Sequence, residues 1–566
     1  MKNAKLALSL LVLSPVTCLA ATDADLVRPK PGQTVDVIVQ YAGSPAAEQH
    51  NRVTTHGGRL LHQYQHVPMG HYAVTPEALA DLESNPDVIS ISPNRVVKGA
   101  EDHSDYSIDF IALDNYYLAI NRGKAAGIGI AIIDSGINAA HPNFNQWSSS
   151  TSRIVYSQTF VGGDTYDEYG HGTHVAGIAA GVDNVIVGIP DATRWFYGVA
   201  MDASIINLKV LDGTGSGTDA TVIAGIDRAI QLKSTYNIRV MNLSLGRPIY
   251  TSYKTDPLCQ AVEQAWKAGI VVVVAAGNNG RDNTHGTNGY GTITAPGNDP
   301  YVITVGAVND KADTDRSDDV IATYSSKGPT AIDHIAKPDL VAPGNRIGSY
   351  QSPNALLTTQ FPGNRFNYSD YRASGANTPS PYYFTLSGTS MATPFVAGAA
   401  AMLIDKDPTL TPDIIKARLM KTAWRGFPPN MSTYDPTTNT TYTAKHDFFT
   451  IGAGMVDTWA AYNSTDKATG TAASPSTYYN SATKTVMLNL NSTGASSIIW
   501  GTNLIWGTNL IWGTTNVNGM SLIWGTSLIW GTSTVSGFSV IWGTSSPWAQ
   551  SNEGTESLSI AANGEN

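Results

Sequence analysis

The chain has 566 residues, enough for several domains and a large apolar core. Only 14% of the residues are charged and the formal net charge is −10, which argues against nucleic acid or an anionic membrane as the main partner. The two cysteines, Cys18 and Cys259, are too few for a disulfide framework.

The N-terminus has the layout of a signal peptide. Lys2 and Lys5 precede the apolar stretch 6–13, and the small residues Ala20 and Ala21 follow it. Since this stretch is too short to span a bilayer, residues 1–21 are predicted to be cleaved after Ala20 or Ala21. The mature protein would then be secreted and extracellular.

Cleavage there would also remove Cys18. Lipid attachment through this cysteine is the weaker alternative, because the preceding segment Pro15-Val16-Thr17 is a poor approach to a lipidated residue. The remaining thiol, Cys259, is predicted to be a buried apolar residue on a helix.

Residues 35–97 predict a small module of strands and helices. Residues 35–41 alternate as a strand, and residues 88–93 return as a second strand. Between them, Thr75 and Pro76 are typical of the cap and first position of a helix.

Two motifs place an acid and a base. The short β-branched run 127–133 predicts a buried parallel strand that ends at Asp134, at the edge where open α/β sheets build their sites. Residues 170–177 predict a helix with His171 in its first turn. A buried carboxylate beside a histidine can fix its tautomer for general base catalysis.

The heptapeptide 388–394 places Ser390 at the mouth of the small-residue helix 394–403. Pro394 suits the first turn, and the N–H groups and the positive end of the helix dipole favour an anion formed beside the serine. Ser390 alone could be a simple helix cap. Together with Asp134 and His171 it completes the order acid, base, nucleophile.

The C-terminal segment 464–566 combines a Ser/Thr/Ala-rich linker with a hexapeptide repeat. The motif Ile-Trp-Gly-Thr recurs with tryptophan at Trp500, Trp506, Trp512, Trp524, Trp530 and Trp542, and Trp548 keeps the spacing. An even period places these rings on one face of a strand. Because exposed indoles would aggregate, we expect them to cover the preceding domain of the chain, a second copy, or a carbohydrate or cell-wall surface.

The segments 132–137, 170–177 and 387–394, which read IIDSGI, GHGTHVAG and SGTSMATP, resemble the three active-site signatures of the subtilisin-like serine peptidases, the subtilases. The resemblance runs from about residue 105 to 463. It implies an α/β, three-layer, subtilisin-like fold with a mainly parallel central sheet. It also implies the catalytic triad Asp134, His171 and Ser390.

The apolar run 270–276 predicts a core strand that leads to Asn278. The resemblance implies that the Asn278 side chain and the Ser390 N–H bind the oxyanion. It also implies that substrate pairs as a strand with two segments and that small residues wall the first pocket. The implied substrate-binding residues are Gly213, Gly215, Gly217, Ser244, Leu245, Gly246, Ala276 and Gly277.

The segments that form the first pocket, including residues 294–297 at its floor, carry no acidic residue. We therefore expect broad specificity. Relatives usually continue with glycine where this chain has Arg247, so the sequence does not predict the structure of the pocket rim.

No cofactor or metal is implied in the chemistry. Relatives place ligands of a structural calcium ion at positions that match Asn143 and Asn184, and an asparagine in place of the usual aspartate at 143 should weaken such a site. Asp164, Asp167 and Glu168 are alternative ligands, although a solvated acidic loop is the expected state of that segment.

The domain organisation follows from these parts. Residues 22–100 resemble the inhibitor prodomain of subtilases, an α+β module whose tail lies in the cleft until it is cut, and self-cleavage is predicted between Val97 and His103. Residues 101–463 form the peptidase domain, and a β-rich repeat tail follows.

The sequence therefore predicts a secreted, self-processed serine endopeptidase that hydrolyses protein or peptide substrates through an acyl-enzyme. Its own prodomain is the predicted intramolecular inhibitor. Two alternatives stay open. One is a catalytically silent binding protein that works through the repeat tail, and the other is a processing protease with a single substrate.

Overall fold

The computed structural model describes residues 20–99, 125–284, 286–311, 316–435, 439–467, 470–480 and 485–489, and four short strands between 499 and 525. The signal peptide before Ala20, most of the cleavage window and most of the repeat lie outside these residues. No helix among the described residues is both long and apolar enough to cross a membrane. The chain divides into two compact units, Met1–Tyr64 with Pro68–Pro93, and Gln65–Val67 with Asn94–Asn566.

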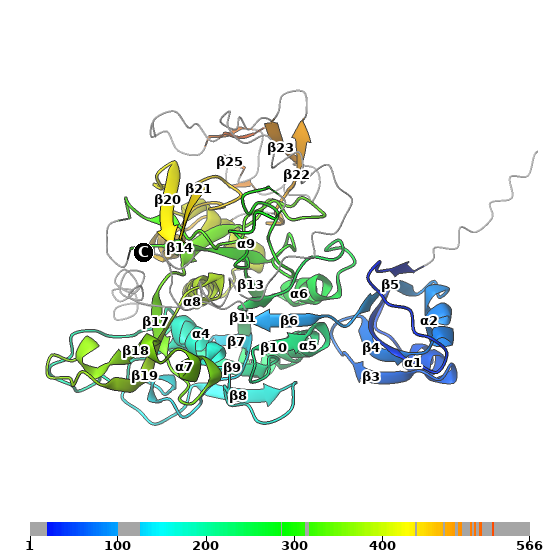
Figure 1. The fold of residues 1–566 in the computed structure, drawn as a ribbon, viewed down its shortest axis with the longest axis horizontal. Coiled ribbons are helices and arrows are strands. Elements are labelled where there is room, and N and C mark those ends of the chain that lie inside the picture. Colours follow the sequence, from blue (N-terminus) through cyan, green and yellow to red (C-terminus); the bar gives the residue numbers. More distant parts are fainter. Residues whose placement is uncertain are drawn as a thin grey trace, which may run out of the picture. The chain divides into compact units, whose positions relative to one another are not determined.

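The first unit is a five-stranded sheet in the order β1-β5-β2-β4-β3 with two helices that pack together (Figure 1). Its strands and helices are β1 (Ala21–Thr22), β2 (Val35–Tyr41), α1 (Ala47–Thr55), β3 (Arg59–Gln63), β4 (Met69–Val74), α2 (Pro76–Glu83) and β5 (Val88–Pro93). Both strands predicted in this module are confirmed. The predicted helix start is also correct, since the Thr75 Oγ1 accepts the N–H of Ala78 at 3.1 Å.

The second unit is built on an eight-stranded sheet in the order β15-β14-β13-β11-β7-β9-β8, with β16 paired to β14. Its strands are β7 (Gly129–Asp134), β8 (Ile154–Thr159), β9 (Ser204–Lys209), β11 (Ile238–Leu243), β13 (Val271–Ala275), β14 (Ile303–Asn309), β15 (Val320–Ile321) and β16 (Leu340–Pro343). All neighbours pair in parallel except β14 with β15. The mainly parallel central sheet is therefore confirmed.

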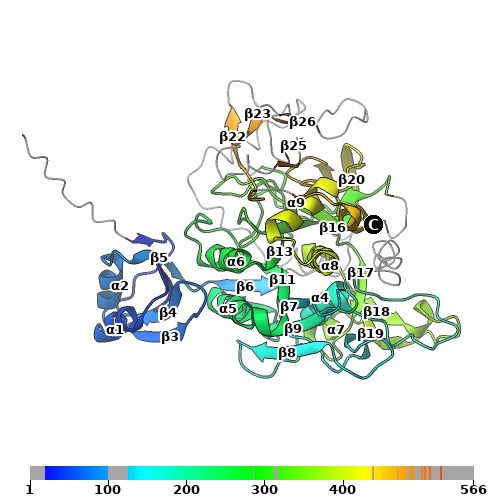
Figure 2. The ribbon, with the colours of Figure 1, turned by 180° about the vertical axis from the view of Figure 1, so that it is seen from behind.

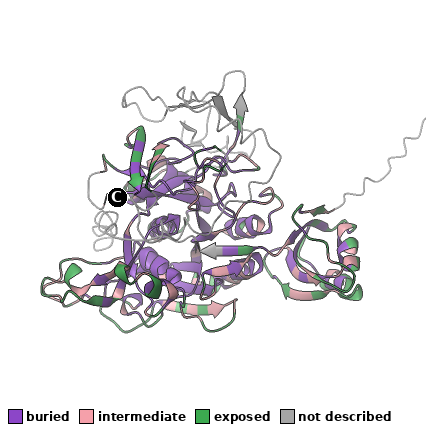
Figure 3. Ribbon diagram, viewed as in Figure 1, coloured by how far each residue is buried: buried purple, intermediate pink, exposed green. Residues whose placement is uncertain are grey.

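Helices cover both faces of this sheet. Figures 1 and 2 show α4 (His171–Ala180) and α8 (Thr389–Lys406) on one face, and α5 (Asp219–Tyr236) and α6 (Pro257–Lys267) on the other. Because both faces are covered, the central strand β13 consists of apolar residues alone, and every one of them is buried (Figure 3). The remaining helices are α7 (Leu356–Gln360), α9 (Pro412–Thr422) and α10 (Thr458–Asn463), with short 3-10 turns η1 (Pro142–Phe144), η2 (Pro362–Asn364) and η3 (Tyr368–Asp370).

Smaller sheets complete the second unit. They contain β6 (Val96–Gly99), β10 (Ser216–Thr218) and β12 (Leu245–Gly246); β17 (Ile347–Tyr350), β18 (Arg365–Asn367) and β19 (Pro379–Leu386); β20 (Asn430–Asp435) and β21 (Thr440–Lys445); and β22 (Ser476–Asn480) and β23 (Thr485–Asn489). The described parts of the repeat are two antiparallel pairs, β24 (Ile499–Trp500) with β25 (Asn503–Leu504) and β26 (Asn509–Ile511) with β27 (Ile523–Gly525). The prediction that the tryptophans share one face extends over residues outside the described set.

Candidate active site

An acid and a base meet where β7 ends and α4 begins. Asp134 is the last residue of β7, His171 is the first of α4, and the His171 Nδ1 lies 2.7 Å from the Asp134 Oδ1. Both side chains are at most 1% exposed. A side chain at Gly172 would place its Cβ 2.2 Å from the Gly136 backbone oxygen, so the glycine permits this close approach. The structure thus joins two of the predicted site residues in one buried pair.

Ser390 lies at the second position of α8, which begins earlier than predicted. The sequence placed Pro394 in the first turn, but α8 runs from Thr389 to Lys406 with Pro394 inside it. The prolyl nitrogen cannot donate to the carbonyl four residues earlier, which is that of Ser390. The Ser244 hydroxyl occupies that acceptor instead, at 2.8 Å, so a long-range contact compensates for the missing helical bond.

The Ser390 side chain forms a reciprocal hydrogen bond with Ser244. Its hydroxyl donates to the backbone oxygen of Ser244 at 3.1 Å, and the residue is fully buried. Helices α4 and α8, whose first turns carry His171 and Ser390, pack against each other. The nucleophile candidate is therefore held by the strand segment that was predicted to bind substrate.

The amide of Asn278 has a defined orientation. Its Oδ1 accepts hydrogen bonds from the backbone N–H and the hydroxyl of Thr389, each at 3.0 Å. The Thr389 hydroxyl also accepts the N–H of Gly277 at 3.2 Å. The NH₂ group is the only donor of this side chain, so it is the part of Asn278 that would bind an oxyanion. Thr389 was missed by the sequence analysis, although it directly precedes the candidate nucleophile.

A strand of the chain's own N-terminal part lies between the two segments predicted to bind substrate. β6 pairs antiparallel with β10 and with β12, so that Val97 is opposite Gly217, and Lys98 is opposite both Ser216 and Gly246. The Val97 side chain is fully buried. A peptide segment thus completes a three-stranded sheet at this place, in the manner of strand addition.

The three glycines predicted to bind substrate do not all lie in a strand. Gly217 lies in β10, whereas Gly213 and Gly215 belong to the turn before it. Gly215 has a φ of +76°, and a Cβ there would lie 2.5 Å from the Tyr169 ring, so both backbone and space require glycine. Gly213 and Gly215 therefore shape the turn that presents β10.

The predicted walls and floor of the first pocket converge. Ala276 and Gly277 follow β13, and the Ala276 backbone oxygen accepts the Thr294 N–H at 3.1 Å. A Cβ on Gly246 would lie 2.6 Å from the Thr294 Oγ1, so β12 passes close to the same threonine. These residues are uncharged, as the sequence analysis noted.

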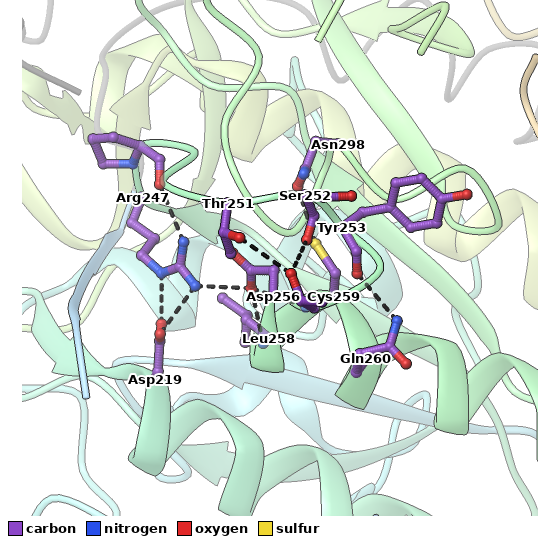
Figure 4. Close-up of polar contacts among 12 residues, drawn as sticks. Asp219, Arg247, Thr251, Ser252, Tyr253, Asp256, Leu258, Cys259, Gln260 and Asn298 are labelled. Carbon is purple, nitrogen blue, oxygen red and sulfur yellow. Dashed lines mark hydrogen bonds and ion pairs between the residues drawn. The ribbon is translucent and has the colours of Figure 1, made fainter. Parts of the chain in front are cut away.

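Arg247 does not occupy the pocket rim. Its side chain is 1% exposed and turns into the body, where Nε and Nη2 bind both carboxylate oxygens of Asp219 at 2.7 and 2.9 Å, and Nη2 binds Asp256 at 2.8 Å (Figure 4). Burial would lower the pKa of this guanidinium, but the two carboxylates outweigh that effect and raise it. The Arg247 N–H and backbone oxygen bond to Ala295 at 3.0 and 2.8 Å, which ties β12 to the pocket floor.

The predicted thiol environment is confirmed. Cys259 is fully buried in α6, and its Sγ lies 3.1 Å from the Asn298 Oδ1 (Figure 4). Burial raises the pKa of the thiol well above its usual value, so it stays protonated and unreactive at neutral pH.

The segment considered for calcium is held by an amide. The Asn184 Nδ2 donates to the backbone oxygens of Pro142, Asn145 and Gln146 at 3.1, 3.3 and 3.1 Å. Asn143 donates to the Asp183 carboxylate at 3.1 Å. Three carbonyl oxygens thus face an N–H₂ group where a cation would need oxygen ligands only. Among the described residues no three or more His, Cys, Asp or Glu side chains gather as a metal site.

The prediction of a solvated acidic loop is wrong for Asp167. It is fully buried, and its carboxylate accepts the Ser135 hydroxyl at 2.8 Å and the N–H groups of Gly170 and Thr173 at 2.7 and 2.8 Å. Burial raises the pKa of Asp167 despite these bonds. Asp167 therefore fixes the first turn of α4, in which His171 lies. Glu168 is more exposed and pairs with Lys209 at 3.0 Å.

Comparisons with known proteins relate most of the chain to one family. The model of the subtilase family matches residues 125–454. Serine protease AprX of Bacillus subtilis is 36% identical over 369 residues, which cover 63% of this chain and 75% of that protein. Subtilisin E of the same organism is 32% identical over 382 residues, 67% of this chain and 81% of that protein.

A solved structure shows the same fold. Fervidolysin from Fervidobacterium pennivorans, a keratinolytic enzyme related to subtilisin, superposes with a TM-score of 0.55 at 20% identity. The match covers 80% of this chain and 64% of that one.

Proposed function

The chain belongs to the subtilase family and is a subtilisin-like serine endopeptidase, and from this premise we propose that Asp134, His171 and Ser390 are its catalytic triad. The observation that carries the proposal is the buried contact of 2.7 Å between the His171 Nδ1 and the Asp134 Oδ1. A carboxylate in this position holds the imidazole in the tautomer whose Nε2 accepts a proton, and it stabilises the imidazolium that forms.

The chemistry then follows from these groups. The Ser390 hydroxyl turns from the Ser244 backbone oxygen toward His171, gives its proton to Nε2 and bonds to the substrate carbonyl carbon. The oxyanion accepts hydrogen bonds from the Asn278 NH₂ and the Ser390 N–H. His171 protonates the leaving amine, and the acyl-enzyme is hydrolysed by water that His171 deprotonates. No metal or cofactor takes part in these steps.

We also propose that residues 22–100 are a prodomain that inhibits the enzyme before it is cut. Support comes from β6, which occupies the place of a substrate strand between β10 and β12. Its last residue, Gly99, is opposite Leu245, directly after the Ser244 that contacts Ser390. A bond shortly after Gly99 would thus reach the nucleophile, in accord with cleavage between Val97 and His103.

Secretion and broad specificity complete the proposal. The signal-peptide layout of residues 1–21 supports export, and a prodomain keeps an exported protease inactive inside its maker. Pocket segments without charged side chains favour broad cleavage. The alternatives of a silent binding protein and of a processing protease make different predictions for the same experiment.

That experiment compares wild type with Ser390→Ala, both produced with the complete N-terminal segment, and with Ser234→Ala, an exposed serine on α5, as the matched control. Wild type and the control should lose residues 1 to about 100 and digest casein, whereas Ser390→Ala should keep residues 22–100 and be inert. N-terminal sequencing and casein hydrolysis are the readouts. Equal processing of all three without casein hydrolysis would contradict the triad, and hydrolysis of only one peptide in a library would favour the processing protease.

A further inference from the structure

Arg95 occupies a well-defined site just before β6. Its side chain is 7% exposed, and its guanidinium carbon lies 4.9 Å from the centre of the Tyr250 ring. Its backbone oxygen accepts the Asp219 N–H at 2.6 Å, and the preceding Asn94 Oδ1 accepts the Ala220 N–H at 2.8 Å. The chain that enters β6 is thus held at the first turn of α5.

Side chains alternate between two sides along β6 and the residue before it, and the Arg95 side chain faces the enzyme. Val97 is fully buried and Val96 is 58% exposed, as expected for successive residues of a strand that lies on a protein surface. Arg95, two residues before Val97, faces the same side as Val97. A peptide that binds in the same register would present the side chain at this position to Tyr250.

The surroundings of Arg95 contain more carboxyl groups than cations. Asp219 and Asp256 are fully buried and share one cation, Arg247, so two carboxyl groups face a single guanidinium (Figure 4). Arg247 also lies beside Tyr250, with its guanidinium carbon 5.8 Å from the ring centre. Burial raises the pKa of Asp219, whereas the charges of Arg247 and Arg95 oppose this rise. Arg95 is a second cation whose charge acts on Asp219.

Both carboxylates are anchored independently of Arg95. Asp219 is the first residue of α5, and Asp256 caps α6 by accepting the N–H groups of Leu258 and Cys259 at 3.0 and 3.3 Å. Negative charge at a helix N-terminus is stabilised by the helix itself. The acidic cluster should therefore persist once the segment that contains Arg95 has been removed, and would then lack its second cation.

We propose that Asp219, Tyr250 and Asp256 form a distal substrate subsite for a basic side chain, three residues before the substrate residue that pairs with Gly246. This subsite rests on the proposed peptidase function and extends it by naming a sequence preference. Arginine should bind better than lysine, because its planar guanidinium stacks on an aromatic ring. The uncharged first pocket and this distal subsite would together give broad cleavage biased toward segments with an upstream arginine.

The test uses internally quenched peptides of the chain's own sequence 93–104 and the secreted, self-processed enzyme. Peptides with Arg95→Gln and Arg95→Lys are compared with the natural sequence, and Val96→Gln at the exposed position is the matched control. We expect Arg95→Gln to lower kcat/KM about fivefold to tenfold, mainly through KM, and Arg95→Lys about twofold to threefold. Val96→Gln should stay within about twofold.

Enzyme variants connect the effect to the site. Tyr250→Leu should remove the difference between the arginine and glutamine peptides, whereas Tyr250→Phe, which keeps the ring, should retain it. Equal kcat/KM for these two peptides with the wild-type enzyme would refute the subsite and leave the peptidase proposal intact. If the enzyme cuts neither the peptides nor casein, the proposed function fails. Fluorescence anisotropy of the labelled peptides then decides the subsite: tighter binding of the arginine peptide supports it, and equal binding refutes it.

Discussion

Ser244 and Ser390 exchange two hydrogen bonds: each hydroxyl donates to the backbone oxygen of the other residue, at 2.8 and 3.1 Å. The first bond exists because Pro394 leaves the Ser390 carbonyl without its helical donor. The segment proposed to bind substrate is thereby attached to the helix that carries the proposed nucleophile, so a shift in either element changes the position of both.

Ser244→Ala should therefore impair both stability and turnover. Loss of the hydroxyl leaves the buried Ser390 carbonyl without its partner, which should lower the free energy of unfolding by about 1–2 kcal/mol. We expect kcat to fall more than KM rises, because the nucleophile loses its alignment. Denaturant unfolding and peptide kinetics measure the two effects. Unchanged values of both would show that the reciprocal bonds are incidental.

Asp134→Asn should keep the shape of the site and remove most of its activity. An amide in place of the carboxylate no longer stabilises the imidazolium and favours the wrong tautomer of His171, so kcat should fall by about four orders of magnitude. Single-turnover kinetics with a peptide substrate would measure the loss. A decrease below tenfold would exclude Asp134 as the partner of a catalytic histidine.

Thr389→Val should reduce turnover through Asn278. The variant loses the hydroxyl that donates to the Asn278 Oδ1 and accepts the Gly277 N–H, so the amide becomes less well oriented toward the oxyanion. We expect kcat to fall about tenfold with little change in KM, a fraction of the 10²–10³-fold loss typical when such a donor is removed entirely. Thr389→Ser keeps the hydroxyl and is the control; equal kcat in the two variants would contradict this positioning role.

Asn184→Asp should make stability dependent on calcium. The substitution replaces a donor by a carboxylate beside three carbonyl oxygens, which repel it in the absence of a cation and suit a hard cation when one is present. With a chelator, the variant should be less stable than wild type by about 2 kcal/mol, and added calcium should reverse this. Wild type should show no such response. Thermal unfolding with chelator and with calcium compares the two proteins.

Asp447 should contribute to the pH dependence of stability. Burial raises its pKa to about 6, although its oxygens accept the Tyr290 hydroxyl and the Phe449 N–H. Since the unfolded carboxyl titrates near 4, the folded state holds a proton that the unfolded state has released between about pH 4 and 6. Its contribution is therefore full below pH 4 and is lost as the pH rises through 6, by roughly 2–3 kcal/mol.

Asp447→Asn removes this titration and can keep both contacts. Unfolding of enzyme inactivated at its active-site serine, followed at pH 4 to 7, should show a smaller decline for the variant than for wild type. Parallel pH curves for the two proteins would contradict the assignment.

Local patterns were sufficient for much of this fold. The strand that ends at Asp134, the helix that begins at His171 and the capped helix after Thr75 were all predictable, because apolar periodicity, caps and proline positions act over a few residues. The roles of Asp134, His171, Ser390 and Asn278 remain predictions, since their placement is observed but their activity is not.

Other features depended on contacts across the chain. The sequence could not show that α8 begins before Pro394, because the lost helical bond is replaced by Ser244, 146 residues away. It could not show that Asp167 is buried or that Arg247 turns from the groove toward Asp219 and Asp256. The sequence motifs alone indicated the family and its chemistry, and the sequence alone shows that the pocket segments are uncharged. Tertiary structure decided which polar groups are buried and paired, because the free energy of a buried charge depends on partners that only folding brings within hydrogen-bond distance.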